Sequence, residues 1–199
     1  ARTTCIKPAG TTSLVLGTSS GIHAWHNDYY IRRLRVGKNE SIYKYLKIHN
    51  PDLVADEYFR PHDTAVIEIP QSAPKGSILR TESAFDLLKR VKKVATEWVK
   101  PGHRSGSNTH NVSATISLKS DEWKKAGEWM WENRDCYNGL SVLPYDGGTY
   151  TQAPFEDITK KEFEKRVKSL SYINLSNIEE TSDETDLSGE LACAGGSCE

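Results

Sequence analysis

The feature that most constrains the fold of this chain is the alternation of strand-like segments with amphipathic helical segments. Between Thr81 and Lys100 apolar residues recur at every third or fourth position, which predicts a helix with Thr81 as its N-cap. Thr159 and Glu162 form the capping-box pattern of a last helix. Strand-like segments cover residues 29–36, 64–69 and 113–118, and we expect Pro70 to end the second of them. Strand and helix in alternation indicate an α/β layer or barrel that closes against strands outside this chain.

The chain starts inside a strand-like segment, with Ala1 in place of an initiator Met, so we expect it to be the C-terminal piece of something larger. Its net charge of -1 gives no electrostatic support for a nucleic-acid or membrane-surface partner. No apolar run approaches the roughly 18 residues of a membrane-spanning helix, and nothing resembles a signal peptide. The 4 cysteines lack a regular framework, which suits a reducing cytoplasm, where a close pair is more often catalytic than structural. We therefore expect a cytoplasmic protein.

The last residues, Cys193-Ala-Gly-Gly-Ser-Cys198-Glu199, carry two cysteines separated by small residues. Because those small residues offer little steric resistance, the backbone can fold back and let Cys193 and Cys198 close a disulfide. The pair ends a segment, residues 169–199, that has several acidic residues but no Lys or Arg and should stay solvated. Such an arm can relay electrons between two thiol partners. A disordered terminus with incidental cysteines is the alternative, and no second Cys or His pair at ligand spacing supports a zinc site.

A turn of small and hydroxyl residues, Lys7-Pro-Ala-Gly-Thr-Thr-Ser13, lies between a predicted strand and a predicted helix start. Backbone N–H groups are unpaired at such a point, and the helix dipole favours an anion. Small residues let a phosphate approach the backbone, and hydroxyl groups add donors. The candidate binding residues are Pro8, Ala9, Gly10, Thr11, Thr12 and Ser13. A purely conformational role for the same residues is the alternative.

Other polar residues along the chain give weaker signals. His23 and His26 have no carboxylate or Cys at ligand spacing, so we expect surface or hydrogen-bonded structural histidines and no metal site. Arg32, Arg33 and Arg35 can hold phosphate, but on an alternating strand such residues more often line a solvated face.

Several motifs together resemble one family. The segments Lys7-Pro-Ala-Gly-Thr-Thr-Ser13, Ser19-Ser-Gly-Ile-His23 and Tyr29-Tyr-Ile-Arg-Arg33 resemble the substrate-phosphate region of adenosylcobalamin-dependent ribonucleotide reductases. The resemblance continues through residues 113–117, 129–135 and 143–150 and ends in the two-cysteine tail. It therefore covers nearly the whole chain and is strongest to the monomeric members that reduce triphosphates.

The resemblance implies the family's fold, an α/β barrel of ten strands with helices outside, of which this chain is the C-terminal part. Residues 1–170 would then form the closing part of the barrel domain, with the substrate-phosphate turn. Residues 171–199 would form a flexible acidic tail that carries the redox cysteine pair.

The resemblance also implies radical reduction of ribonucleotides, with ribonucleoside triphosphates as substrates and adenosylcobalamin as the cofactor of the complete enzyme. In the family, homolysis of the cobalt–carbon bond leads to a cysteine thiyl radical that removes the ribose 3′ hydrogen. Two further cysteines reduce the 2′ carbon and end as a disulfide. By motif, Pro8 to Ser13 would hold the phosphates, and Cys193 and Cys198 would re-reduce that disulfide and be restored by thioredoxin.

One family motif, the Asn-x-Cys-x-Glu radical loop, is absent from this sequence, and Cys5 and Cys136 lie in other contexts. We expect both to be structural, with Cys5 near the site. The chain alone should therefore be inactive and should need the N-terminal portion of the reductase as a partner. The alternative is a free-standing phosphate-binding or thiol-carrier module without catalysis of its own.

Overall fold

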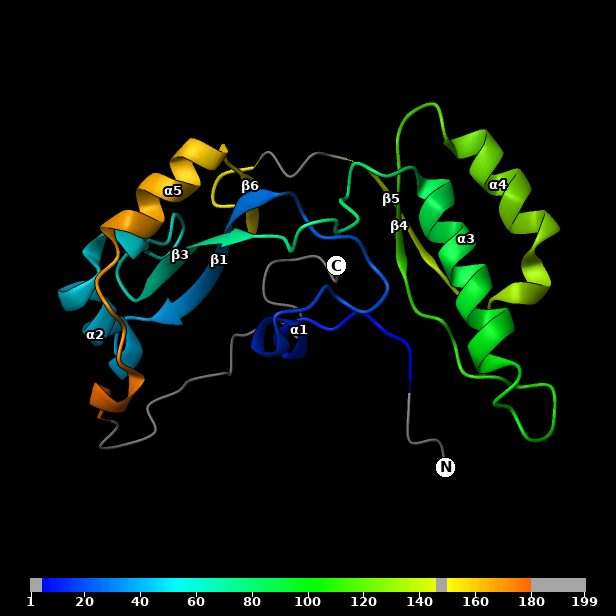
Figure 1. Ribbon diagram of the computed structural model, residues 1–199, viewed down its shortest axis with the longest axis horizontal. Coiled ribbons are helices and arrows are strands. Elements are labelled where there is room, and N and C mark those ends of the chain that lie inside the picture. Colours follow the sequence, from blue (N-terminus) through cyan, green and yellow to red (C-terminus); the bar gives the residue numbers. More distant parts are fainter. Residues whose placement is uncertain (1–4, 146–149, 180–199) are drawn as a thin grey trace. The chain divides into compact units, whose positions relative to one another are not determined.

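The computed structural model describes residues 5–145 and 150–179, and this part of the chain divides into two compact units (Figure 1). The first unit contains residues 5–25 and 76–145, and the second contains residues 26–75 and 150–179. Within these ranges no helix is both long and apolar enough to span a bilayer. Residues 180–199, with Cys193 and Cys198, lie outside the described residues, so the expected redox tail stays a prediction.

The first unit is built on parallel strands. Strand β4 (Thr115–Leu118) pairs in parallel with β5 (Ser141–Pro144), and Ile6 forms a parallel bridge with Val112 just before β4. Helices α3 (Ala84–Val94) and α4 (Trp123–Glu132) pack with these strands through a shared apolar core. Three of its side chains are completely buried: Leu88, Val91 and Ile116. A short helix, α1 (Thr11–Leu16), follows the Ile6 bridge, and a 3-10 turn (Arg134–Cys136) follows α4.

The amphipathic segment 81–100 is helical as expected, but its N-cap is Ser83 and the prediction of Thr81 was wrong. The Ser83 hydroxyl accepts from the Asp86 N–H, and the Asp86 carboxylate accepts from the Ser83 N–H, so the capping box is complete. The last turn, Ala95–Val99, is a π-helix. Here the Thr96 hydroxyl donates to the carbonyl groups of Lys92 and Lys93. The helix ends before Pro101, which cannot continue it.

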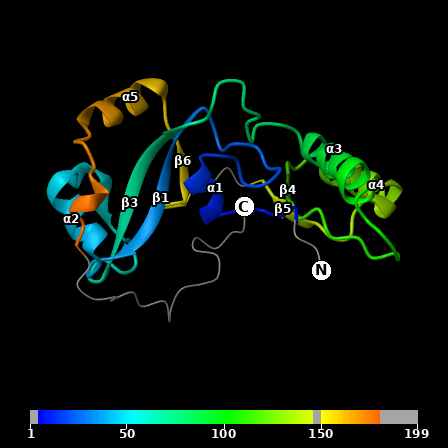
Figure 2. The same cartoon turned by 60° about the horizontal axis from the view of Figure 1, so that its bottom comes forward.

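The second unit is an antiparallel sheet with the strand order β2-β3-β1-β6. Its strands are β1 (Tyr29–Gly37), β2 (Val54–Asp56), β3 (Thr64–Ser72) and β6 (Phe155–Asp157). Helix α2 (Ser41–His49) packs on the face of the sheet that carries Ile67, and α5 (Lys160–Ser169) contacts Glu68 of β3 through Arg166 (Figures 1 and 2). Because successive strand residues alternate between faces, Ile67 and Glu68 belong to opposite faces. The core between α2 and the sheet is formed by Tyr45, Leu46, Leu53 and Ile67, the third from the 3-10 turn Pro51–Leu53.

Strand and cap predictions for the second unit hold in part. The strand at residues 29–36 is confirmed, and Thr159 caps α5 by accepting from the Glu162 N–H at 3.2 Å. The Glu162 carboxylate, however, accepts from Arg166 at 2.8 Å. Strand β3 runs through Pro70 to Ser72, so the expected stop at Pro70 was wrong. Since β2 pairs only with Ala65–Ile67, Pro70 lies where β3 has no neighbour on that side and needs no N–H.

The architecture confirms the α/β class, with one parallel and one antiparallel sheet in the described residues. A ten-stranded barrel stays a prediction. The expected body, residues 1–170, divides into two units, and packed chain continues beyond residue 170. Ile173 and Ile178, on either side of the 3-10 turn Leu175–Asn177, pack against the core of the second unit.

Candidate functional site

Of the candidate turn, residues 8–10 leave the first unit's sheet where the Ile6 bridge ends, and residues 11–13 already form the first turn of α1. Gly10 is the N-cap of α1, and no side chain caps this helix end. The first N–H groups of any helix have no acceptor inside the helix, and together they carry a partial positive charge. The start of α1 therefore offers unpaired N–H groups that can donate to an anion.

Some of the expected donors are used inside the turn. The Ala9 N–H donates to the Ser20 Oγ at 2.9 Å, and the Ser13 hydroxyl, which is buried, donates to the carbonyl groups of Ala9 and Gly10. Ser13 and Ser20 therefore fix the shape of the turn. The donors that remain toward solvent are the backbone N–H groups at the helix start and the exposed Thr12.

Open space surrounds Gly10. Its φ of -70° is one that any L residue can adopt, and a Cβ built there would meet no heavy atom within 4 Å. The turn therefore does not need glycine for its backbone conformation. A small residue at this position keeps the space above the helix start free for a ligand.

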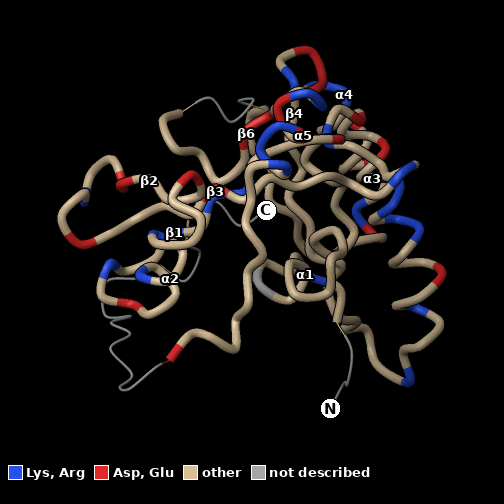
Figure 3. Tube along the Cα trace, turned by 60° about the vertical axis from the view of Figure 1, so that its left-hand side comes forward, with Lys and Arg blue, Asp and Glu red and all other residues tan. Residues whose placement is uncertain are grey.

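The charge around the turn is positive and sparse. Among residues 5–27, Lys7 carries the sole Lys, Arg, Asp or Glu side chain, and it is exposed. Figure 3 shows no acidic residue along α1 or the segment leading into it. The stretch around the turn therefore contributes a positive charge and no negative one.

A residue that the sequence predictions did not include, Gly21, holds the segment behind the turn. Its φ is +59°, and a Cβ there would lie 2.5 Å from the carbonyl oxygen of Lys7. Only glycine allows this close approach. The Gly21 position appears in the motif Ser19-Ser-Gly-Ile-His23, but its role depends on contact with Lys7, which the sequence does not reveal.

The arginines of β1 are engaged inside the second unit. Arg33 donates to Glu68 at 2.8 Å and also to Glu156, while Arg35 pairs with Glu57 at 3.4 Å. Burial acts to lower the pKa of Arg33, but hydrogen bonds to the two carboxylates outweigh it and raise that pKa above its usual value. The expectation of a solvated face was wrong for Arg33, which is largely buried between two carboxylates, whereas Arg35 is exposed as expected and Arg32 lies over the Phe155 ring at 4.2 Å.

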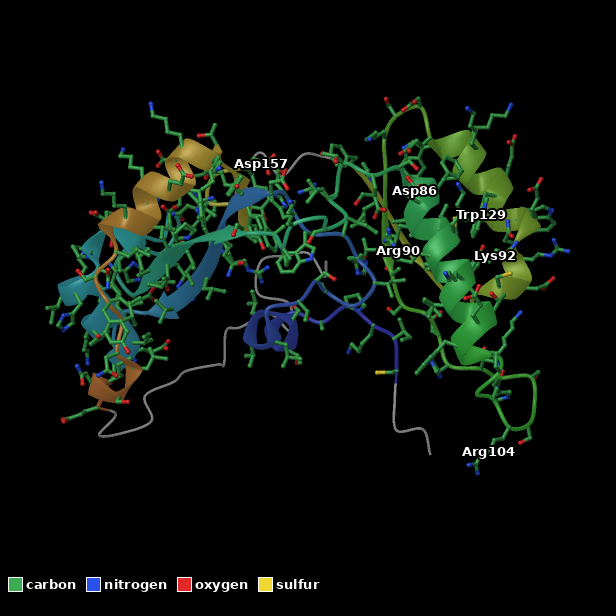
Figure 4. The ribbon with its side chains drawn as sticks, viewed as in Figure 1. Asp86, Arg90, Lys92, Arg104, Trp129 and Asp157 are labelled. Atoms are coloured by element: carbon green, nitrogen blue, oxygen red, sulfur yellow. The ribbon has the colours of Figure 1, made fainter. Side chains whose placement is uncertain are left out.

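The remaining candidates have structural surroundings. His26 is buried, its Nε2 lies 3.0 Å from Asp157 (labelled in Figure 4), and its ring stacks on Phe155, which fits the expected structural histidine. Cys5 is exposed and lies just before the turn, and Cys136 is half-buried after α4. Both are free thiols. The described ranges contain no group of three His, Cys, Asp or Glu side chains able to hold a metal ion.

The structure is thus an α/β chain in which an uncapped helix follows the end of a parallel strand segment. Ligands commonly bind at that end of the strands in α/β sheets. No family model matches the sequence. The chain is 28% identical over 207 residues to the adenosylcobalamin-dependent ribonucleoside-triphosphate reductase of Lactobacillus delbrueckii subsp. bulgaricus. The protein of that name from Lactobacillus acidophilus is 29% identical over 202 residues. Each match covers 98% of this chain and 26% of the relative.

Comparison with solved structures gives the same group of proteins. A crystal structure of B12-dependent (class II) ribonucleotide reductase matches with a TM-score of 0.67 and 26% identity, over 82% of this chain and 22% of that one. The similarity expected from the motifs is therefore confirmed. This chain spans 26% of the length of the relatives named above and aligns with a portion of each.

Proposed function

We propose that this chain is a portion of an adenosylcobalamin-dependent ribonucleotide reductase and that the turn from Pro8 to Ser13 binds the phosphates of a ribonucleoside triphosphate. The observation that carries the proposal is the uncapped start of α1, with open space at Gly10, in a chain similar to such reductases over 98% of its length. An anion at a helix start gains hydrogen bonds from otherwise unpaired N–H groups.

The turn acts in this proposal through its backbone. Ser13 and Ser20 hold the loop in shape, so that the N–H groups of Thr11 and Thr12 stay directed outward from the helix start. Lys7 adds a positive charge that attracts the triphosphate. Each charge-assisted hydrogen bond to a phosphate oxygen contributes about 1.5–3 kcal/mol. The turn thus binds and orients the substrate and takes no part in bond cleavage.

The cysteine pair supplies the reducing equivalents in this proposal. Replacement of the 2′ hydroxyl by hydrogen releases water and takes two electrons from an active-site dithiol, which becomes a disulfide. Cys193 and Cys198 return two electrons and two protons to that disulfide by thiol exchange and become a disulfide themselves. Thioredoxin then reduces the pair. Steady turnover with thioredoxin by an enzyme that carries Ser at both positions would contradict this role.

Adenosylcobalamin, through homolysis of its cobalt–carbon bond, supplies the radical in the complete enzyme. We assign no described residue of this chain to it, and the sequence lacks the Asn-x-Cys-x-Glu loop. In this proposal the chain's own residues therefore bind substrate and deliver electrons, and the radical step belongs to the rest of the reductase.

Gly10→Val in the complete enzyme tests the phosphate site. The free turn tolerates a side chain at this φ and has room for it, so the fold should persist. The valine would occupy the space of the phosphate, and loss of one charge-assisted hydrogen bond should raise the KM for triphosphate roughly tenfold to a hundredfold. Gly127→Val on the exposed side of α4, where a Cβ also meets nothing within 4 Å, is the matched control. An unchanged KM in Gly10→Val would reduce the turn to a conformational element.

A further inference from the structure

We propose that His23 is a positioning residue that fixes the phosphate-binding turn to strand β4 through a single neutral tautomer. The proposal rests on the function assigned to the turn above. His23 is half-buried and is separated from the turn by α1 along the sequence. Its ring nevertheless joins two backbone groups that belong to different parts of the first unit.

The two contacts of the ring define its protonation. Nδ1 lies 2.8 Å from the carbonyl oxygen of Ser20, which can only accept, so Nδ1 carries a hydrogen. Nε2 lies 3.0 Å from the backbone nitrogen of Thr115, which can only donate, so Nε2 must be the unprotonated acceptor. Only the neutral Nδ1–H tautomer makes both bonds.

The contact of His23 with β4 supplies an acceptor for a strand N–H on an edge that has no partner strand at that point. Before the turn, the Ser113 N–H donates to the carbonyl oxygen of Ile6 at 3.0 Å, as in a regular parallel pair. The next N–H on the same edge belongs to Thr115, since strand residues alternate. By that point the chain has left the sheet at Pro8, and His23 Nε2 accepts the bond in place of a strand. The side chain thus extends the ladder past the point where the backbone turns away.

The contact continues from His23 into the turn. Ser20, whose carbonyl oxygen accepts from His23, also accepts the Ala9 N–H with its Oγ. Behind it, Arg90 of α3 (labelled in Figure 4) donates to the carbonyl oxygen of Ile22 at 2.9 Å and is held by Glu82. The segment from Ser20 to His23 is therefore fixed on both sides. A path of hydrogen bonds leads from β4 through His23 and Ser20 to Ala9, directly before the helix start.

His23 acts in this proposal by holding the turn in position. The ring of His23 bonds to Ser20 and Thr115, and nothing lies within 4 Å of a Cβ at Gly10, so His23 sets where the turn lies and leaves the chemical step alone. Loss of the Thr115 bond should let the turn move, and substrate binding should weaken while the maximal rate stays near that of the wild type.

The test compares His23→Leu, which removes both bonds, with His23→Gln, whose amide offers a donor and an acceptor. In the complete enzyme we expect His23→Leu to raise the KM for triphosphate about tenfold, the scale of one buried hydrogen bond, with kcat within about threefold of the wild type. His23→Gln should recover most of the loss. His103→Leu removes a histidine with a local contact to Gly106 and should change neither constant.

Two measurements on the chain itself keep the proposal falsifiable if His23→Leu fails to fold. Nitrogen-15 NMR of the His23 ring should show the Nδ1–H tautomer, and an Nε2–H tautomer would overturn the proposal. In Ser20→Ala the Ala9 amide should exchange with solvent faster, and unchanged exchange would break the path. If Gly10→Val raises KM but His23→Leu does not, the positioning role fails alone. If Gly10→Val has no effect, the function of the turn fails first.

Discussion

Strand β1 of the second unit and the start of α1 in the first unit satisfy their polar groups in different ways. In β1, Arg33 pairs with Glu68 and Glu156, and Arg35 pairs with Glu57. In the first unit the start of α1 has no cap, and one exposed lysine is the nearest charge in sequence. Paired charges hold a fold together, whereas donors left open at a helix start are ready for a ligand. The contrast supports the proposal that the start of α1 binds the substrate phosphates.

Arg33→Leu is the strongest way to break this comparison. Only 9% of the Arg33 side chain is exposed, and removal of one partner of a largely buried ion pair leaves the other charge uncompensated. We expect a loss of about 3 kcal/mol in the free energy of unfolding, measured by urea denaturation. The KM for triphosphate in the complete enzyme should not change. Arg104→Leu, at an exposed loop position of the first unit (Figure 4), should cost less than about 0.5 kcal/mol. A raised KM in Arg33→Leu with unchanged stability would mean that β1 binds phosphate.

A second test of the comparison is the pH dependence of stability that Glu57 contributes. Its buried carboxylate accepts from the N–H groups of Phe59 and Arg60, both at 2.7 Å. Burial acts to raise the pKa of Glu57, but these bonds and Arg35 outweigh it and lower that pKa from 4.5. The unfolded chain then binds the proton more readily, so the stabilisation is complete above about pH 4.5 and is lost as pH falls through the folded value.

Glu57→Gln should therefore destabilise the chain by about 2 kcal/mol at neutral pH, the scale of hydrogen bonds to a charged group. The difference from the wild type should shrink as the pH falls below 4.5. Urea denaturation across this range measures both. Glu164→Gln removes an exposed carboxylate 3.7 Å from Lys160 and should have little effect at any pH. A constant difference at all pH values would show that the charge of Glu57 contributes nothing.

The sequence was informative where the signal is local and periodic. The strand at 29–36, the helix within 81–100 and the Thr159 cap follow from alternation, from apolar spacing and from a hydroxyl before a helix. The contact of His23 with Thr115 depends on the parallel pairing of segments far apart in sequence, and that of Ala9 with Ser20 depends on how the chain returns after α1. No periodicity encodes that register. The turn could therefore be predicted from its residues, whereas the side chains that position it could not.

The smallest expected effect concerns the start of α3, where the sequence pointed to Thr81 and the structure has Ser83. Both are hydroxyl residues before the same apolar pattern, and only Ser83 makes the reciprocal bonds with Asp86. Ser83→Ala should cost about 1 kcal/mol of unfolding free energy, because the Asp86 N–H loses its side-chain acceptor. Thr81→Ala is the matched control and should cost only a few tenths of that. Because this cap lies in the first unit but far in sequence from α1, neither variant should alter the KM for triphosphate. Equal losses in the two variants would mean that the hydroxyl groups act through general helix propensity and that the cap has no special role.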